Sequence, residues 1–183
     1  MRTKTNEPGW PEQVGVGLIA GFLGTAAMTV AMVAMHRRLP PGQRGPLPPY
    51  HISMAAAERA GMKPHMTVNS RFATTMVLHF AYGSAVGALY IPFARLVPVM
   101  HPLKGMVFGV LVWAGSYLGW LPLAGLLSPA TRHPAARNGL MIAAHLVWGT
   151  VIATWVHTLL NTARSGSRNI WIETGRCRGR TSS

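Results

Sequence analysis

Two histidines in two apolar stretches are the residues of this sequence best suited to chemistry. His79 and His145 each lie eight residues after an arginine, Arg71 or Arg137, that precedes an uncharged stretch. If both stretches are helices, a rise of about 1.5 Å per residue places each imidazole about 12 Å along its helix. Two neutral imidazoles at the same depth are suited to bind a haem iron or a metal ion.

Three interpretations of this histidine pair remain open. In the first, His79 and His145 are axial ligands of haem b, although tight glycine packing between their helices would leave no room for the macrocycle. In the second, each histidine is a polar clasp that hydrogen-bonds to a neighbouring helix. In the third, the pair lies on a pathway for protons or a small solute, because ionisable groups within a membrane are candidates for function. The sequence has no zinc-ligand spacing, so we predict no separate metal site.

The two histidine stretches resemble each other at an offset of 66 residues, and this internal repeat needs no gaps. It aligns the histidines and then an aromatic residue, a glycine and a hydroxyl: Tyr82 with Trp148, Gly83 with Gly149, and Ser84 with Thr150. The apolar stretches that precede them match more weakly at an offset of 88, which aligns Gly17 with Gly105 and Gly21 with Gly109. The repeat predicts two helical hairpins in tandem, related by a pseudo-twofold axis along the membrane normal.

Charge placement predicts that four stretches cross a membrane. Residues 13–36, 72–94, 105–131 and 138–163 contain no Asp, Glu, Lys or Arg, although the chain carries 17 Lys and Arg. A charge at mid-bilayer costs about 2.5 to 3.5 kcal/mol, and a span needs about 20 apolar residues. We therefore expect an all-α integral membrane protein with transmembrane helices at about 14–36, 72–94, 105–127 and 138–160. Their orientation is not decided, because the two sets of loops and ends carry nearly equal numbers of Lys and Arg.

The predicted domain organisation is a single four-helix membrane domain over residues 1–163 and a basic, disordered tail over residues 164–183. The first loop begins with a proline-rich run, and the sequence HISMAAAERAG that follows predicts a short interfacial helix ending at Gly61. Pro122 should kink or end the third membrane helix, because proline has no N–H and clashes with the preceding turn.

Glycines in the predicted spans indicate close helix packing. Small residues four positions apart let two helix backbones approach each other, and seven glycines are suited to this role: Gly17, Gly21, Gly83, Gly87, Gly105, Gly109 and Gly149. We expect the protein to self-associate, or to join a larger membrane complex, through these glycine faces.

The composition argues against most soluble functions. The formal net charge is +13, and in a membrane protein basic loops meet anionic lipid headgroups, so the lipid bilayer is an expected partner and nucleic acid is not. The sequence has no glycine-rich phosphate loop, no nucleophile elbow and no paired carboxylates within the spans. The preferred interpretation is a helical membrane protein without catalysis of its own; haem-based electron transfer and small-solute or proton transport are the alternatives.

Three short motifs carry a family resemblance. GLIAGFLGT in the first span, PLPP in the first loop and HLVWG in the fourth span resemble the bacterial YagU-like inner-membrane proteins. The resemblance covers all four spans and implies a small multi-pass protein of the bacterial inner membrane, in a family without an established activity. The first loop is shorter than in that family and the arginine-rich tail is additional, so orientation and termini are not carried over.

Overall fold

The computed structural model describes residues 9–178, and the side chains of residues 9–162 except Gln43. The chain is 82% helical, and the described residues form no strand, which confirms the predicted all-α fold. Four helical segments are long and apolar enough to cross a membrane: Trp10–Arg37, Val68–Leu96, His101–Leu123 and Ala135–Thr162. These segments coincide with the four uncharged stretches, because a helix in lipid must keep charged side chains at its ends.

The helices follow one another as two hairpins with interruptions. The first hairpin contains α1 (Trp10–Arg37), α2 (Pro48–Arg59), α3 (Val68–Gly87) and α4 (Tyr90–Leu96). The second contains α5 (His101–Ala114), a π-helical segment (Gly115–Trp120), α6 (Leu121–Leu123) and α7 (Ala135–Arg178). Single 3₁₀ turns lie at Pro41–Gln43, Lys63–His65 and Ala130–Arg132. Gly61 follows α2 and Gly125 follows α6, each at a positive φ that glycine adopts without strain.

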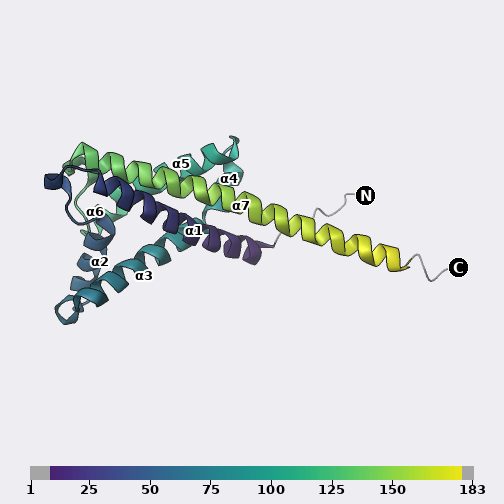
Figure 1. Cartoon of the computed structure of the whole chain (residues 1–183), viewed down its shortest axis with the longest axis horizontal. Coiled ribbons are helices and arrows are strands. Elements are labelled where there is room, and N and C mark those ends of the chain that lie inside the picture. Colours follow the sequence, from purple (N-terminus) through teal and green to yellow (C-terminus); the bar gives the residue numbers. More distant parts are fainter. Residues whose placement is uncertain (1–8, 179–183) are drawn as a thin grey trace.

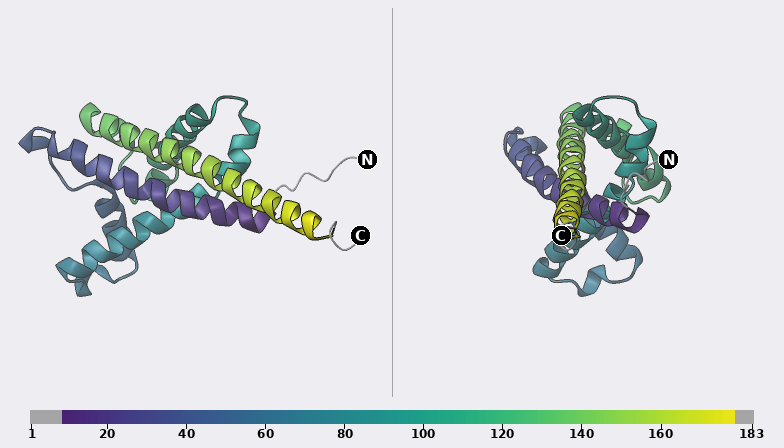
Figure 2. Two further views of the ribbon diagram at one scale, coloured as in Figure 1. Left: turned by 45° about the vertical axis from the view of Figure 1, so that its right-hand side comes forward. Right: turned by 90° about the vertical axis from the view of Figure 1, so that its right-hand side faces the viewer.

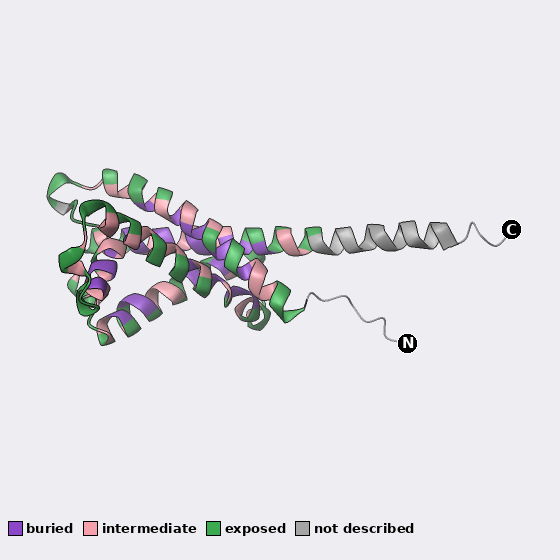
Figure 3. Ribbon diagram, turned by 90° about the horizontal axis from the view of Figure 1, so that it is seen from below, coloured by how far each residue is buried: buried purple, intermediate pink, exposed green. Residues whose placement is uncertain are grey.

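The four long helices pack as an open row and not as a closed ring. The extensive helix contacts are those of α3 with α1, α1 with α7, and α7 with α5. Figure 1 shows α1 and α7 side by side along the long axis, while α3 diverges from them and α2 stands in the opening. The view along that axis in Figure 2 places α7 between α1 and α5. In Figure 3 the buried residues concentrate where the helices converge, and the outer faces of the row are exposed.

Glycines bring the backbones of α1 and α3 into contact. A Cβ atom added to Gly21 would lie 2.5 Å from the carbonyl oxygen of Gly83 and 2.9 Å from the Cα of Ser84. A Cβ atom added to Gly17 would lie 2.6 Å from the Cα of Ala88, and one added to Gly87 would lie 2.5 Å from the Cα of Gly21. Only glycine fits at these positions, because the atoms in the way belong to the backbone.

The contact between α5 and α7 uses corresponding positions of the second hairpin. A Cβ atom on Gly105 would meet the backbone of Gly149 and, at 2.8 Å, the Cβ of Ala153. One on Gly109 would lie 2.9 Å from the carbonyl carbon of His145 and 3.6 Å from the Cα of Gly149. Under offsets of 88 and 66 residues, the contact of Gly21 with Gly83 corresponds to that of Gly109 with Gly149, whereas the contacts of Gly17 with Ala88 and of Gly109 with His145 have no counterpart. The common origin of the two hairpins stays a prediction.

Two helix boundaries differ from those expected. The second span is not continuous, because Ala88 and Leu89 separate α3 from α4. The fourth helix does not end near residue 160, since α7 continues to Arg178 and the sequence has no proline after Pro134 to stop it. Most of the tail that we predicted to be disordered is therefore helical here, and residues 179–183 lie outside the described part. The domain boundary at residue 163 stays a prediction.

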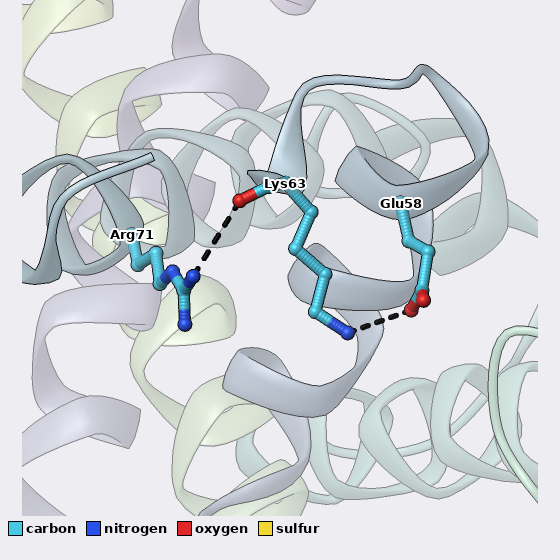
Figure 4. Close-up of polar contacts among 3 residues, drawn as sticks. All are labelled: Glu58, Lys63 and Arg71. Carbon is cyan, nitrogen blue, oxygen red and sulfur yellow. Dashed lines mark hydrogen bonds and ion pairs between the residues drawn. The ribbon is translucent and has the colours of Figure 1, made fainter. Parts of the chain in front are cut away.

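The short helix predicted in the first loop is α2, which packs against α3. Figure 4 shows the turn that joins these two helices. The Lys63 Nζ donates a hydrogen bond to Glu58 at 2.7 Å, and the Arg71 guanidinium donates to the Lys63 carbonyl at 3.5 Å. The hydrogen bond from Lys63 lowers the pKa of the Glu58 carboxyl. These contacts tie the end of α2 to the start of α3.

Replacing Gly21 by alanine should destabilise the protein, because the added Cβ meets the backbone of α3. Such overpacking costs about 1 to 3 kcal/mol, which corresponds to a fall of roughly 2 to 12 °C in the thermal unfolding midpoint. Circular dichroism of the detergent-purified protein measures this fall. Gly15→Ala is the matched control, since a Cβ there has nothing within 4 Å. Equal midpoints for Gly21→Ala and Gly15→Ala would show that α1 and α3 do not touch as described.

Candidate ligand-binding cavity

A cavity of about 260 Å³ lies where α2, α3, the π-helical segment and α7 meet, and both predicted histidines line it. We call it the histidine cavity. Apart from His79 and His145, its polar lining comes from Ser53, Tyr82, Ser116, Tyr117 and Trp120. The remaining lining is apolar: Met28, Met32, Pro49, Ile52, Ala56, Leu78, Leu121, Leu126 and Met141. The structure thus brings together two side chains that are 66 positions apart in sequence.

His145 presents a free lone pair at this site. Its Nδ1 lies 2.8 Å from the carbonyl oxygen of Met141, one turn earlier in α7. A carbonyl oxygen only accepts, so Nδ1 carries the proton and donates, and Nε2 of the neutral ring is an acceptor. The ring of Tyr117 contacts the imidazole edge-on, with centroids 6.0 Å apart. This packing and the backbone hydrogen bond fix the imidazole orientation.

His79 has a buried Nε2 atom without a hydrogen-bond partner. Its ring lies edge-on to Phe80, with centroids 6.0 Å apart. Leaving a buried polar atom without a partner costs about 1 to 3 kcal/mol. No hydrogen bond joins His79 or His145 to a neighbouring helix in the described part of the chain, so the polar-clasp interpretation has no support in this geometry.

The π-helical segment forms one wall of the histidine cavity. Pro122 has no N–H to continue an α-helix, and the preceding turns widen, so that the Leu121 N–H bonds to the Ser116 carbonyl. Within this segment Gly119 leaves helical geometry, with φ −106° and ψ −108°. The widened turn carries Ser116 and Trp120 to the cavity. The helix is therefore distorted, as predicted for Pro122, and the distortion lies in the turns that precede this proline.

Three polar side chains join α3 to the π-helical segment at the mouth of the cavity. The Tyr82 hydroxyl is hydrogen-bonded to the Ser116 hydroxyl at 2.9 Å, and the Trp120 indole donates to the Tyr82 oxygen at 3.3 Å. The rings of Tyr82 and Trp120 lie 5.7 Å apart. Tyr82 is 39% exposed, Trp120 is 42% exposed and the neighbouring Leu78 is 44% exposed. This side of the cavity therefore borders the outer, lipid-facing surface.

Trp148, which the repeat aligns with Tyr82, lies outside the cavity. Its indole donates to the Thr25 hydroxyl at 3.2 Å, and that hydroxyl donates to the Gly21 carbonyl at 2.7 Å. Each aromatic residue of the repeat thus connects its own hairpin to the other hairpin. The two hydroxyl residues of the repeat, Ser84 and Thr150, do not line the cavity, and Thr150 bonds to the Leu146 carbonyl of its own helix.

Comparison with known proteins places the chain in a family. A family model described as "Protein of unknown function (DUF1440)" matches residues 28–154, more than half of the chain. The chain belongs to this family. The comparisons with curated proteins and with solved structures found no match. The DUF1440 match supports an uncharacterised family, and the YagU-like name stays a resemblance.

Sequence reasoning missed the part that α2 plays in this DUF1440 protein. The position of α2 at the membrane surface stays a prediction, and its residues Pro49, Ile52, Ser53 and Ala56 also line the histidine cavity, which the sequence did not indicate. Ile52 and Ala56 are four residues apart and so share one face of the helix. This spacing was visible in the sequence, but it did not show what the face would pack against.

Proposed function

We propose that this DUF1440 protein is a multi-pass protein of the bacterial inner membrane, without catalysis of its own, that holds a small lipid-soluble molecule in the histidine cavity. One observation carries the proposal: two imidazoles line a mainly apolar cavity whose mouth borders the lipid-facing surface. The four apolar helices support the membrane location. The resemblance to bacterial inner-membrane proteins supports the choice of membrane.

The lining of the cavity indicates the chemistry of the ligand. No Asp, Glu, Lys or Arg lines it, so a charged ligand group would be desolvated without a counter-charge. Methionine, leucine and isoleucine side chains would bury a hydrocarbon body, at about 25 cal/mol per Å² of apolar surface. The Nε2 of His145 accepts a hydrogen bond and so selects a donor. A neutral molecule with an apolar body and one hydroxyl group, such as a long-chain alcohol or a quinol, satisfies both conditions.

The hydrogen bonds at the mouth of the histidine cavity are weak enough for a ligand to enter the cavity from the bilayer. A hydrogen bond of this kind contributes about 0.5 to 1.5 kcal/mol net, so separating Tyr82 from Ser116 and Trp120 is a small cost. The extensive helix contacts do not include one between α3 and the π-helical segment, so no packed interface has to open. A ligand dissolved in lipid would reach the histidines by displacing these side chains.

Photolabelling with a diazirine derivative of decanol tests the proposal on the full chain in lipid nanodiscs. Mass spectrometry should locate saturable label on cavity residues such as Met28, Met32 and Ile52. His145→Leu removes one hydrogen-bond acceptor and should weaken labelling about tenfold, since about 1.4 kcal/mol is a factor of ten. Ala56→Leu should also reduce labelling, because it fills the cavity and removes no hydrogen bond.

Leu123→Ala is the control for this experiment, because Leu123 is 89% exposed and lies outside the cavity. Its saturable labelling should equal that of the unmodified protein. Label that spreads evenly over lipid-facing side chains, or that persists unchanged in both His145→Leu and Ala56→Leu, would contradict binding in the cavity.

Haem b is a second candidate ligand, because the two nitrogens it would need are both without partners. The Nε2 of His145 has a lone pair, and the Nε2 of His79 has no hydrogen bond. An absorption spectrum of the purified protein, before and after dithionite reduction and with a metal assay, tests this. If haem is bound, a Soret band should shift on reduction, disappear in His79→Ala and His145→Ala, and persist in His157→Ala. A colourless, metal-free sample would contradict haem b and leave the alcohol site.

We also propose that the protein forms a homo-oligomer or joins a larger membrane complex. The seven predicted glycines contact helices of the same chain, so any such assembly uses other surfaces. Exposed apolar side chains on the outer faces, including Phe22, Val77 and Leu111, support contact with lipid or with a second subunit. Mass photometry in nanodiscs should give a multiple of the 19.7 kDa chain mass, and a single-chain mass would contradict self-association.

A further inference from the structure

A second cavity, of about 620 Å³, lies against the opposite side of α2. We call it the basic cavity. It is an open hollow bordered by α2, by Lys63 of the following turn, by the loop after α6 and by the first turn of α7. Its titratable lining residues are Tyr50, His51, Glu58, Lys63, His133 and Arg137. The candidate membrane span of α7 begins at Ala135. The basic cavity, which His133 and Arg137 line, therefore lies at the end of the membrane-spanning bundle where α7 begins.

The charges of the basic cavity do not cancel. Glu58, its one carboxylate, is paired with Lys63 at 2.7 Å, and this is the one ion pair among the described side chains. Arg137 has no acidic partner in that part of the chain and donates one hydrogen bond to the Pro46 carbonyl at 3.3 Å. The cavity therefore has one full positive charge without a counter-ion.

His51 of the basic cavity lies within the electrostatic reach of Arg137. Partial burial lowers the pKa of His51, and the positive charges of Arg137 and His133 lower it further. The other titratable neighbours are Tyr50 and the ion pair of Glu58 with Lys63. A bound anion would relieve this repulsion.

The start of α7 adds a further positive potential. The helix begins at Ala135, between His133 and Arg137, which both line the basic cavity. The N-terminus of a helix carries roughly half a positive charge and favours anions. The guanidinium, two imidazoles and this helix end surround one space.

We propose that the basic cavity binds a phosphate group. A guanidinium presents paired N–H donors to phosphate oxygens; a neutral imidazole donates from one ring nitrogen, and a protonated one donates from both. Two sources share this chemistry: the headgroup of an anionic phospholipid, and a free phosphate in solution. Leu126 and α2 contribute to both cavities, so the phosphate site and the histidine cavity are neighbours with different ligands.

The test measures the two phosphate sources separately on the delipidated full chain. Native mass spectrometry counts phosphatidylglycerol adducts against phosphatidylcholine, and thermal unfolding with inorganic phosphate against chloride at equal ionic strength reports the free anion. Arg137→Gln should weaken the bound form about tenfold or more. Arg132→Gln should not, because Arg132 is an exposed arginine of the same loop that does not line the cavity.

A second pair of variants is needed because Arg137→Gln also removes a hydrogen bond and so can impair folding. Arg137 donates a hydrogen bond to the Pro46 carbonyl, whereas the His51 side chain has no hydrogen bond among the described residues. His51→Glu should abolish binding by placing a negative charge in the cavity. His65→Glu adds the same charge at an exposed position outside it and should leave binding unchanged.

The outcomes are distinct. Specific phosphatidylglycerol adducts identify a lipid headgroup site, and a stabilisation by inorganic phosphate identifies a free-phosphate site. Binding of neither probe, or an equal loss in Arg137→Gln and Arg132→Gln, would overturn the proposal in favour of diffuse attraction. Decanol labelling of the histidine cavity should be unchanged in Arg132→Gln and His51→Glu, so the two sites can fail independently.

Discussion

Direct contact between glycine backbones is the constraint on which the rest of this structure depends. In lipid, apolar side chains gain little by leaving solvent for a neighbouring helix, so close packing and interhelical hydrogen bonds must hold the helices together. Gly21 against Gly83, and Gly109 against Gly149, supply that packing within each hairpin. The hydrogen bond from Trp148 to Thr25 then fastens the second hairpin to the first. These contacts leave α3 and the π-helical segment without backbone packing against each other, and the side chains of Tyr82, Ser116 and Trp120 join them.

The histidine cavity arises because residues that the predicted repeat aligns have different surroundings in the two hairpins. Trp148 is buried between α7 and α1, whereas Tyr82, its counterpart, is 39% exposed and reaches across a gap to Ser116. The first loop is the longer of the two equivalent loops, and its helix α2 enters this gap. A chain with two equal loops would have no such insert. The difference between the two loops therefore places His79 and His145 in unlike surroundings within one cavity.

Much of the fold could be predicted from the sequence, because a segment that crosses the bilayer must be apolar and free of charge over about 20 residues. The four spans followed from where charges are absent, and the pairing of His79 with His145 in one region followed from the 66-residue offset. What could not be predicted depends on tertiary contacts. The widened turn at Ser116, the position of α2 and the break at Ala88 depend on the helices packed against them. The spacing of apolar residues in the sequence does not indicate any of the three. Similarly, the glycine pattern showed close packing but not whether the partner helix belonged to the same chain.

The residues that hold the helices together and those that line the histidine cavity are separate sets, since none of the seven glycines lines the cavity. This separation affects how the family can diversify. A glycine in backbone contact tolerates no change of size, whereas Met28, Ile52 or Leu78 can be exchanged for another apolar residue at modest cost. Evolution is thus free to vary the shape of the cavity while the scaffold stays constant. Under the proposed function, members of the family with the same helix contacts would differ in the molecule that their cavities hold.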